Sequence, residues 1–90
     1  MSRMGPALKA IGQALPNMAD VDYQTLAGAI ATSTHGTGKA FGSYASQVVG
    51  LQLVTASDEV LDCDAQHHAE VFKAGRVSLG ALGLVTRVRL

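Results

Sequence analysis

The chain has 90 residues, enough for one small domain with a modest core. Its seven basic and seven acidic residues balance, and aromatic residues are limited to two Tyr and two Phe, which argues against a nucleic-acid partner. No segment approaches the roughly 18 apolar residues of a membrane span, and the first residues lack the apolar stretch of a secretory signal. The single cysteine excludes an internal disulfide and a cysteine metal cluster. We therefore expect a cytoplasmic protein, with membrane association left open for a longer form of the chain.

The first half of the sequence predicts two short helices and a loop. Residues 6–14 carry apolar side chains at helical spacing, and Pro16 is expected to end this helix. After a loop over residues 17–22, Thr25 can cap a second helix that runs to about Thr32, with small residues that suit close packing. Residues 35–43 predict an irregular, glycine-rich loop.

The second half predicts two strands, a helix and a third strand. Residues 47–55 alternate, and residues 60–64 return as a second strand after a turn. Residues 66–77 predict a helix with Asp64 as its cap, and residues 84–90 alternate again. The side chains expected to face inward are Val49, Leu51, Leu53 and Cys63 in the strands and Val71, Phe72, Gly75 and Leu79 in the helix.

Glycine is concentrated in two parts of the chain. Five of the ten glycines lie between Gly28 and Gly50, and three more lie between Gly75 and Gly83. A domain of this size that folds by itself usually needs larger side chains in such positions. We therefore expect the chain to be part of a larger fold.

The segment Thr25–Lys39 begins as a short helix of small residues and runs into a loop of Thr, Ser, His and Gly, with almost no large side chains. Such a segment lets a ligand approach the backbone and presents N–H and O–H donors, so it predicts a phosphate or pyrophosphate site. The glycine spacing matches neither the P-loop nor the dinucleotide fingerprint. A purely structural loop is the alternative. The hydroxyls of Thr32, Ser33, Thr34 and Thr37 favour the ligand, because buried unpaired hydroxyls are costly.

Other residues that could carry chemistry have simpler explanations. His35 has no acidic neighbour in the sequence, which favours a structural or phosphate-contacting role over catalysis. His67 and His68 could bind a metal, but adjacent histidines point in different directions, so a solvated helix start is favoured. Cys63 is expected to be buried and inert, because no activating base lies nearby in the sequence. We therefore expect no catalytic residue and no metal site in this chain.

Two motifs are specific in their order and distance: Thr34-His35-Gly36-Thr37-Gly38 and Leu79-Gly80-Ala81-Leu82-Gly83. The stretches that accompany them are 15–18, 25–28, 46–49, 53–56 and 69–77. Together they resemble the vanillyl-alcohol-oxidase-type flavoproteins, and most closely the aldonolactone oxidase branch, with its L-gulono-1,4-lactone and D-arabinono-1,4-lactone oxidases. The resemblance extends from about Leu15 to Leu90.

The resemblance implies part of an FAD-binding domain of the PCMH type. This is an α+β fold in which short helices pack on a small mixed or antiparallel sheet. It also implies that the loop contacts FAD through backbone amides and hydroxyls, and that the start of the last strand lies against the flavin nucleotide. The cofactor-binding residues expected on this basis are Ser33, Thr34, His35, Gly36, Gly38, Ala40, Phe41, Gly42, Ser43 and Val85.

The function implied is that of an FAD-dependent oxidoreductase that oxidises a sugar 1,4-lactone with O₂ or another acceptor. An alditol oxidase and a non-catalytic nucleotide-binding remnant are the alternatives. We expect residues 1–14 to form a helical lead-in and residues 15–90 part of the FAD-binding domain, since the family's upstream flavin loop and substrate-cap domain have no counterpart here. The expected partners are a lactone or polyol substrate and the remainder of the oxidase chain. The chain alone is expected to be inactive.

Overall fold

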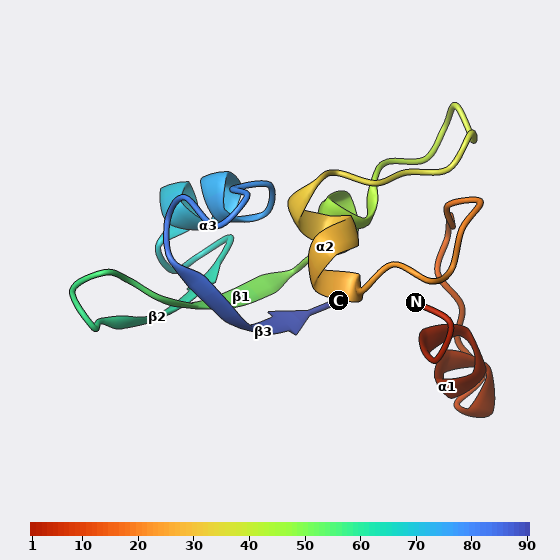
Figure 1. The fold of residues 1–90 in the computed structure, drawn as a ribbon, viewed down its shortest axis with the longest axis horizontal. Coiled ribbons are helices and arrows are strands. Elements are labelled where there is room, and N and C mark those ends of the chain that lie inside the picture. Colours follow the sequence, from red (N-terminus) through yellow and green to blue (C-terminus); the bar gives the residue numbers. More distant parts are fainter.

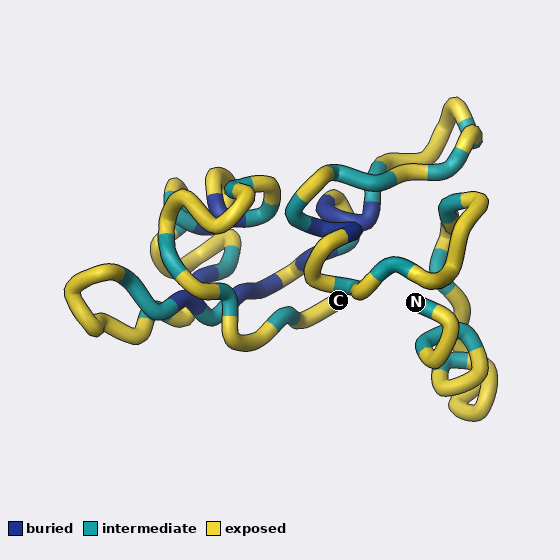
Figure 2. Tube along the Cα trace, viewed as in Figure 1, coloured by how far each residue is buried: buried dark blue, intermediate teal, exposed yellow.

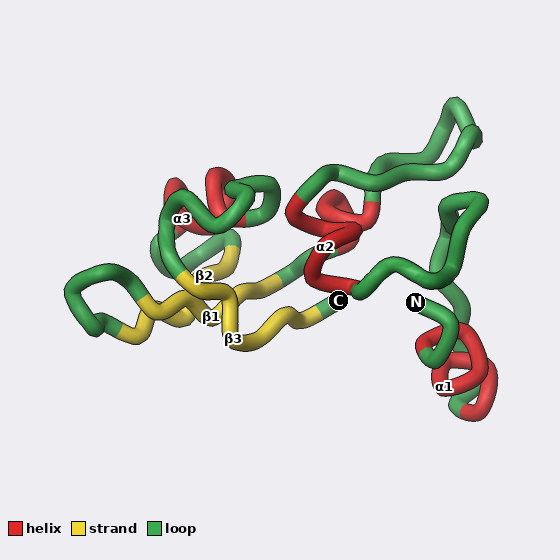
Figure 3. Tube along the Cα trace, in the orientation of Figure 1, coloured by secondary structure: helices red, strands yellow, loops and turns green.

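The computed structural model describes residues 1–90, which form three α-helices, a 3-10 helix and one three-stranded sheet (Figures 1 and 3). In chain order the elements are α1 (Met4–Ala10), α2 (Leu26–Ala31), η1 (Tyr44–Gln47), β1 (Gly50–Val54), β2 (Val60–Asp64), α3 (Ala69–Gly75) and β3 (Leu84–Arg89). Short helices beside an antiparallel sheet confirm the predicted α+β class. The sequence did not indicate η1, which precedes the strand predicted for residues 47–55 and overlaps it only at Gln47.

The central strand of the sheet is β1. The strand order is β2-β1-β3, and both pairings are antiparallel. β1 and β2 form a hairpin across residues 55–59, closed by Thr55 N, which donates to Glu59 O over 2.9 Å. β3 joins the opposite side of β1 after the chain has passed through α3. The free edges of the sheet therefore belong to β2 and β3.

A bulge in β3 changes which of its side chains face the core. Gln52 pairs with Arg87, whereas the next residue of β1, Leu53, pairs with Val85. β3 therefore contains one additional residue at this point. As a result Val85 and Val88, three residues apart, both pack against the core. The strict alternation predicted for residues 84–90 is wrong for this reason.

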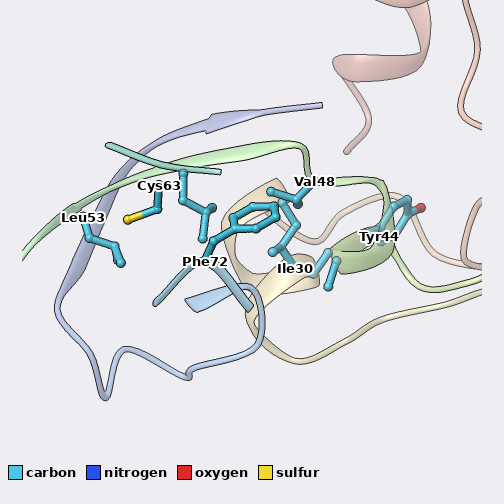
Figure 4. Close-up of a cluster of buried hydrophobic side chains, with 9 residues drawn as sticks. Ile30, Tyr44, Val48, Leu53, Cys63 and Phe72 are labelled. Atoms are coloured by element: carbon cyan, nitrogen blue, oxygen red, sulfur yellow. The ribbon is translucent and has the colours of Figure 1, made fainter. Parts of the chain in front are cut away.

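The core lies between one face of the sheet, α3, and the pair formed by α2 and η1 (Figures 2 and 4). Its buried side chains are Ala29, Ile30, Tyr44, Ala45, Val48, Leu51, Leu53, Cys63 and Phe72. Burial of Leu51, Leu53, Cys63 and Phe72 was predicted. The burial predicted for Val49 and Leu79 is wrong. Val49 is 52% exposed and precedes β1, which begins only at Gly50. Leu79 is 74% exposed because it lies beyond the end of α3.

The first helix, α1, stands apart from the other elements and has no buried residue (Figures 1 and 2). It ends at Ala10, four residues before the predicted end at Ala14. Gly12 adopts a left-handed backbone conformation (φ +72°), and Gln13 N donates back to Leu8 O over 2.9 Å. Gly12 therefore ends the helix, and the predicted stop at Pro16 is wrong.

The largest hollow of the surface also lies beside α1. It measures about 570 Å³ and is lined by Met4 and Leu8 of α1 together with Gln47 and Leu90. None of the helices is long and apolar enough to cross a membrane.

Candidate cofactor-binding loop

The helix α2 leads the chain into the candidate loop. Its start is capped as predicted, because Thr25 Oγ1 accepts a hydrogen bond from Gly28 N over 3.0 Å. Ala29 and Ile30 are buried and hold the helix in the core. After α2 ends, Ser33 turns the chain with a left-handed φ of +56°.

Residues 34–43, called the 34–43 loop below, leave the body of the protein and return to it between α2 and η1 (Figure 1). Thr34 N donates to Ala29 O, and Tyr44 N donates to Thr34 O, both over 2.9 Å. These two hydrogen bonds close the base of the loop. The loop contains no helix or strand, so secondary structure does not occupy its backbone donors.

Free backbone amides are the main chemical feature of the 34–43 loop. Among residues 35–43, only Phe41 donates its amide to a protein acceptor, Gly38 O, over 3.1 Å. The one lysine of the loop, Lys39, is exposed, and the loop contains no carboxylate. Successive free N–H groups beside a positive charge are what a bound anion requires.

Only some of the predicted hydroxyl donors remain free for a ligand. Thr32 Oγ1 donates to Gly28 O over 2.9 Å and lies 3.2 Å from Thr34 Oγ1. These two hydroxyls therefore support the end of α2. The hydroxyls of Ser33 and Thr37 make no hydrogen bond within the protein, so these two are the ones available to a ligand.

Gly36 packs closely against Asn17 and Met18, which lie outside the loop. A Cβ atom at Gly36 would overlap Met18 O and lie 2.6 Å from Asn17 Oδ1. Glycine at position 36 is therefore explained by this close contact within the protein, without a ligand. The sequence predicts a loop that begins at Asn17, but nothing in the spacing of Asn17 and Met18 indicates this contact with Gly36.

The second motif lies away from the 34–43 loop. Val85 lines a crevice of about 50 Å³, formed by α2, the residues that follow α3, and β3. Ile30 and Gly80 line the same crevice, and no residue of the 34–43 loop does. The crevice is small beside the roughly 300–1,000 Å³ of ordinary ligand pockets. The crevice that Gly80 and Val85 line therefore contains no residue of the first motif.

Asp64 organises the turn before α3. Its Oδ1 accepts the amides of Gln66 and His67 over 2.9 and 2.8 Å and lies 3.0 Å from His67 Nδ1. Its Oδ2 lies 3.5 Å from Arg89. The hydrogen bond from the Gln66 amide and those from His67 lower the pKa of Asp64 to about 2. Because α3 begins only after His68, Asp64 caps this turn and not the helix itself, contrary to the prediction.

The remaining candidates have no arrangement that supports catalysis. His35 Nδ1 lies 2.8 Å from the carbonyl oxygen of the next residue, and the side chain is exposed. Burial, together with the charges of Asp62 and Asp64, raises the pKa of the Cys63 thiol. No group of three potential metal ligands occurs in the structure.

Comparison with known proteins agrees with the resemblance seen in the motifs. The chain is 45% identical over 97% of its length to an L-gulono-1,4-lactone dehydrogenase of Mycobacterium tuberculosis and 42% identical over its whole length to an L-gulonolactone oxidase of Bos taurus. It is 40% identical over 92% of its length to a D-arabinono-1,4-lactone oxidase of Eremothecium gossypii. The chain covers only 20%, 20% and 16% of these relatives, respectively.

The family match concerns the cofactor and includes the candidate loop. Residues 1–64, well over half of the chain, match the family described as FAD binding domain. This stretch contains α1, α2, the 34–43 loop and the β1–β2 hairpin. The chain therefore belongs to the FAD binding domain family.

Proposed function

We propose that the chain forms one wall of the FAD site in an oxidoreductase that oxidises a sugar 1,4-lactone. The observation that carries the cofactor contact is the 34–43 loop, whose amides are free in a segment without carboxylates. The substrate class comes from the names of the relatives, which are lactone dehydrogenases and oxidases. Because the chain spans about a fifth of those proteins, the activity of the whole enzyme is part of the proposal.

The donor set of the loop fits the pyrophosphate of FAD. The amides of residues 35–40, 42 and 43 have no protein acceptor, and the hydroxyls of Ser33 and Thr37 are free as well. Unpaired N–H groups can stabilise phosphate oxygens without a matching number of charged side chains, which supports this proposal. We assign to this contact Ser33, Thr34, His35, Gly36, Gly38, Ala40, Phe41, Gly42 and Ser43, and we assign Val85 to the nucleotide.

Bound FAD would supply the electron acceptor for the oxidation of a CH–OH carbon. The part of this chain is to bind and orient the cofactor, and none of its residues is assigned as a catalytic acid or base. We further propose residues 1–14 as a lead-in and residues 15–90 as part of the FAD-binding domain. A cytoplasmic location belongs to the same proposal and rests on the single cysteine.

The cofactor contact can be tested on the chain itself by NMR titration of isotope-labelled protein. Addition of FAD or ADP should shift the amide signals of residues 35–43, whereas AMP, which has no pyrophosphate, should shift them much less. The amides of Leu51 and Leu53 in the core serve as internal controls. Equal shifts with AMP, or shifts confined to other residues, would contradict the assignment of the loop.

The cofactor role can also be tested in a complete enzyme, by means of a chimera. This chain would replace the matching segment of the Mycobacterium tuberculosis relative, which aligns over 87 residues. We expect the purified chimera to retain FAD and to oxidise L-gulono-1,4-lactone. Loss of FAD from a folded chimera would favour a remnant without cofactor function.

A further inference from the structure

Tyr44 connects two segments that are distant in the sequence. Its side chain is only 3% exposed, and its ring belongs to the core cluster. Its hydroxyl points away from Phe72 and out of the cluster (Figure 4). There the hydroxyl oxygen accepts a hydrogen bond from Ala19 N over 3.0 Å. The backbone amide of Tyr44 donates to Thr34 O and so closes the base of the 34–43 loop.

Residues 17–19, called the strap below, form the surface against which Gly36 rests. A Cβ atom on Gly36 would meet the strap at Met18 O and Asn17 Oδ1. The position of the strap therefore limits where the middle of the 34–43 loop can lie. The hydrogen bond from Ala19 N to Tyr44 is the only one that residues 17–19 make.

The polar groups around this contact leave the strap dependent on Tyr44. Asn17 Nδ2 is buried and has no hydrogen-bond partner, so the side-chain amide of Asn17 makes no hydrogen bond that would connect the strap to the loop. After the strap in the sequence, Gln24 Nε2 donates to Thr34 Oγ1 over 3.4 Å, and Gln24 Oε1 is unpaired. A single hydroxyl thus provides the directional attachment of the strap, while the remaining contacts are van der Waals contacts.

We propose that Tyr44 is a positioning residue for FAD, which acts through the strap on the 34–43 loop. This inference rests on the proposed cofactor contact of that loop. With the hydroxyl in place, the strap holds Gly36 and the free amides around it in one arrangement before the ligand binds. Without the hydroxyl, ordering the strap and loop becomes part of the cost of binding, which weakens affinity.

Tyr44→Phe tests this inference, because it removes the hydroxyl and keeps the buried ring. The matched control is Tyr23→Phe, since Tyr23 is 82% exposed and its hydroxyl makes no hydrogen bond. We expect Tyr44→Phe to lower the NMR order parameters of residues 17–19 and 35–38 and to leave those of Leu51 and Leu53 unchanged. Loss of one such hydrogen bond should weaken FAD binding about 3- to 10-fold, whereas Tyr23→Phe should leave it unchanged.

A second variant removes the donor and leaves Tyr44 intact. Ala19→Pro has no N–H at this position, so it should reproduce the weaker FAD binding. The double variant should bind FAD no more weakly than either single variant, because both remove the same interaction. Additive losses in the double variant would overturn the role assigned to this hydrogen bond. The Ala19→Pro variant also decides the question if Tyr44→Phe does not fold.

The outcomes separate this inference from the proposed function. If FAD shifts the loop amides of the unmodified chain but binds Tyr44→Phe with unchanged affinity, the positioning role is wrong and the cofactor contact stands. A lower melting temperature with unchanged affinity would likewise reduce Tyr44 to a structural residue. If FAD causes no shift in the unmodified chain, the cofactor contact fails, and the order parameters still show whether Tyr44 holds the strap.

Discussion

Replacement of Gly83 by alanine should destabilise the protein strongly, because this glycine lies against the backbone at the end of β1. Its φ of +138° is a conformation that side-chain-bearing residues rarely adopt. A Cβ atom would overlap Val54 O and lie 3.1 Å from the carbonyl carbon of Val54 and 3.3 Å from Thr55 Cα. Backbone strain of about 1–3 kcal/mol and overpacking of about 1–3 kcal/mol together predict a loss of about 2–6 kcal/mol.

Two other glycines provide graded controls for this variant. Gly80 has a left-handed φ of +82° but open space around it, so Gly80→Ala should cost only about 1–2 kcal/mol of backbone strain. Gly5 lies in α1 with nothing within 4 Å, so Gly5→Ala should cause no loss.

The three variants can be ranked by thermal unfolding followed by circular dichroism. For a chain of this size, about 4–8 °C of melting temperature corresponds to 1 kcal/mol, so Gly83→Ala should melt at least about 8 °C below the unmodified chain. If Gly83→Ala and Gly80→Ala lower the melting temperature equally, the contact with β1 contributes nothing and the argument is refuted. Gly83→Leu, which adds a larger side chain at the same point, should be at least as destabilising.

Three further predictions concern pH, the cofactor and the isolated chain. The pKa of Asp64 is lowered from 3.8 to about 2 in the folded protein. The stability that the ionised carboxylate contributes is therefore present above about pH 4 and is lost as the pH falls through 2. The acid unfolding of Asp64→Asn should lack this dependence of stability on pH. Gly36→Val should displace the strap, and the chimera that carries it should lose FAD, as measured by flavin absorbance; normal flavin content would contradict this reading. The isolated chain should oxidise no lactone and bind FAD more weakly than low micromolar in fluorescence titrations, because it contacts the dinucleotide on one side only. Tight binding or any turnover would overturn that expectation.

Features that depend on neighbouring residues could be predicted from the sequence. The cap at Thr25 was correct because the hydroxyl and the amide it binds are three residues apart. The inward direction of Leu51 and Leu53 was correct because β1 follows the two-residue period of a strand. The position of the candidate loop between a helix and the first strand could be predicted for the same reason.

Features that depend on distant residues could not be predicted in this way. The bulge in β3 is set by its pairing with β1, and no local pattern in residues 84–90 indicates it. The contact of Gly36 with the strap and the hydrogen bond from Ala19 to Tyr44 span 18 and 25 residues. The sequence therefore indicated which residues form the loop but not what supports it.

The position of β1 between β2 and β3 has a consequence for how the chain folds. Pairing β1 with β2 closes a loop over residues 55–59, whereas pairing β1 with β3 closes one over residues 55–83. The longer closure costs about 1.5 kcal/mol more conformational entropy. The hairpin should therefore form first, with β3 adding after α3 has covered Leu51 and Leu53. Substitutions in β3 should then speed unfolding more than they slow folding, while substitutions in the hairpin should slow folding.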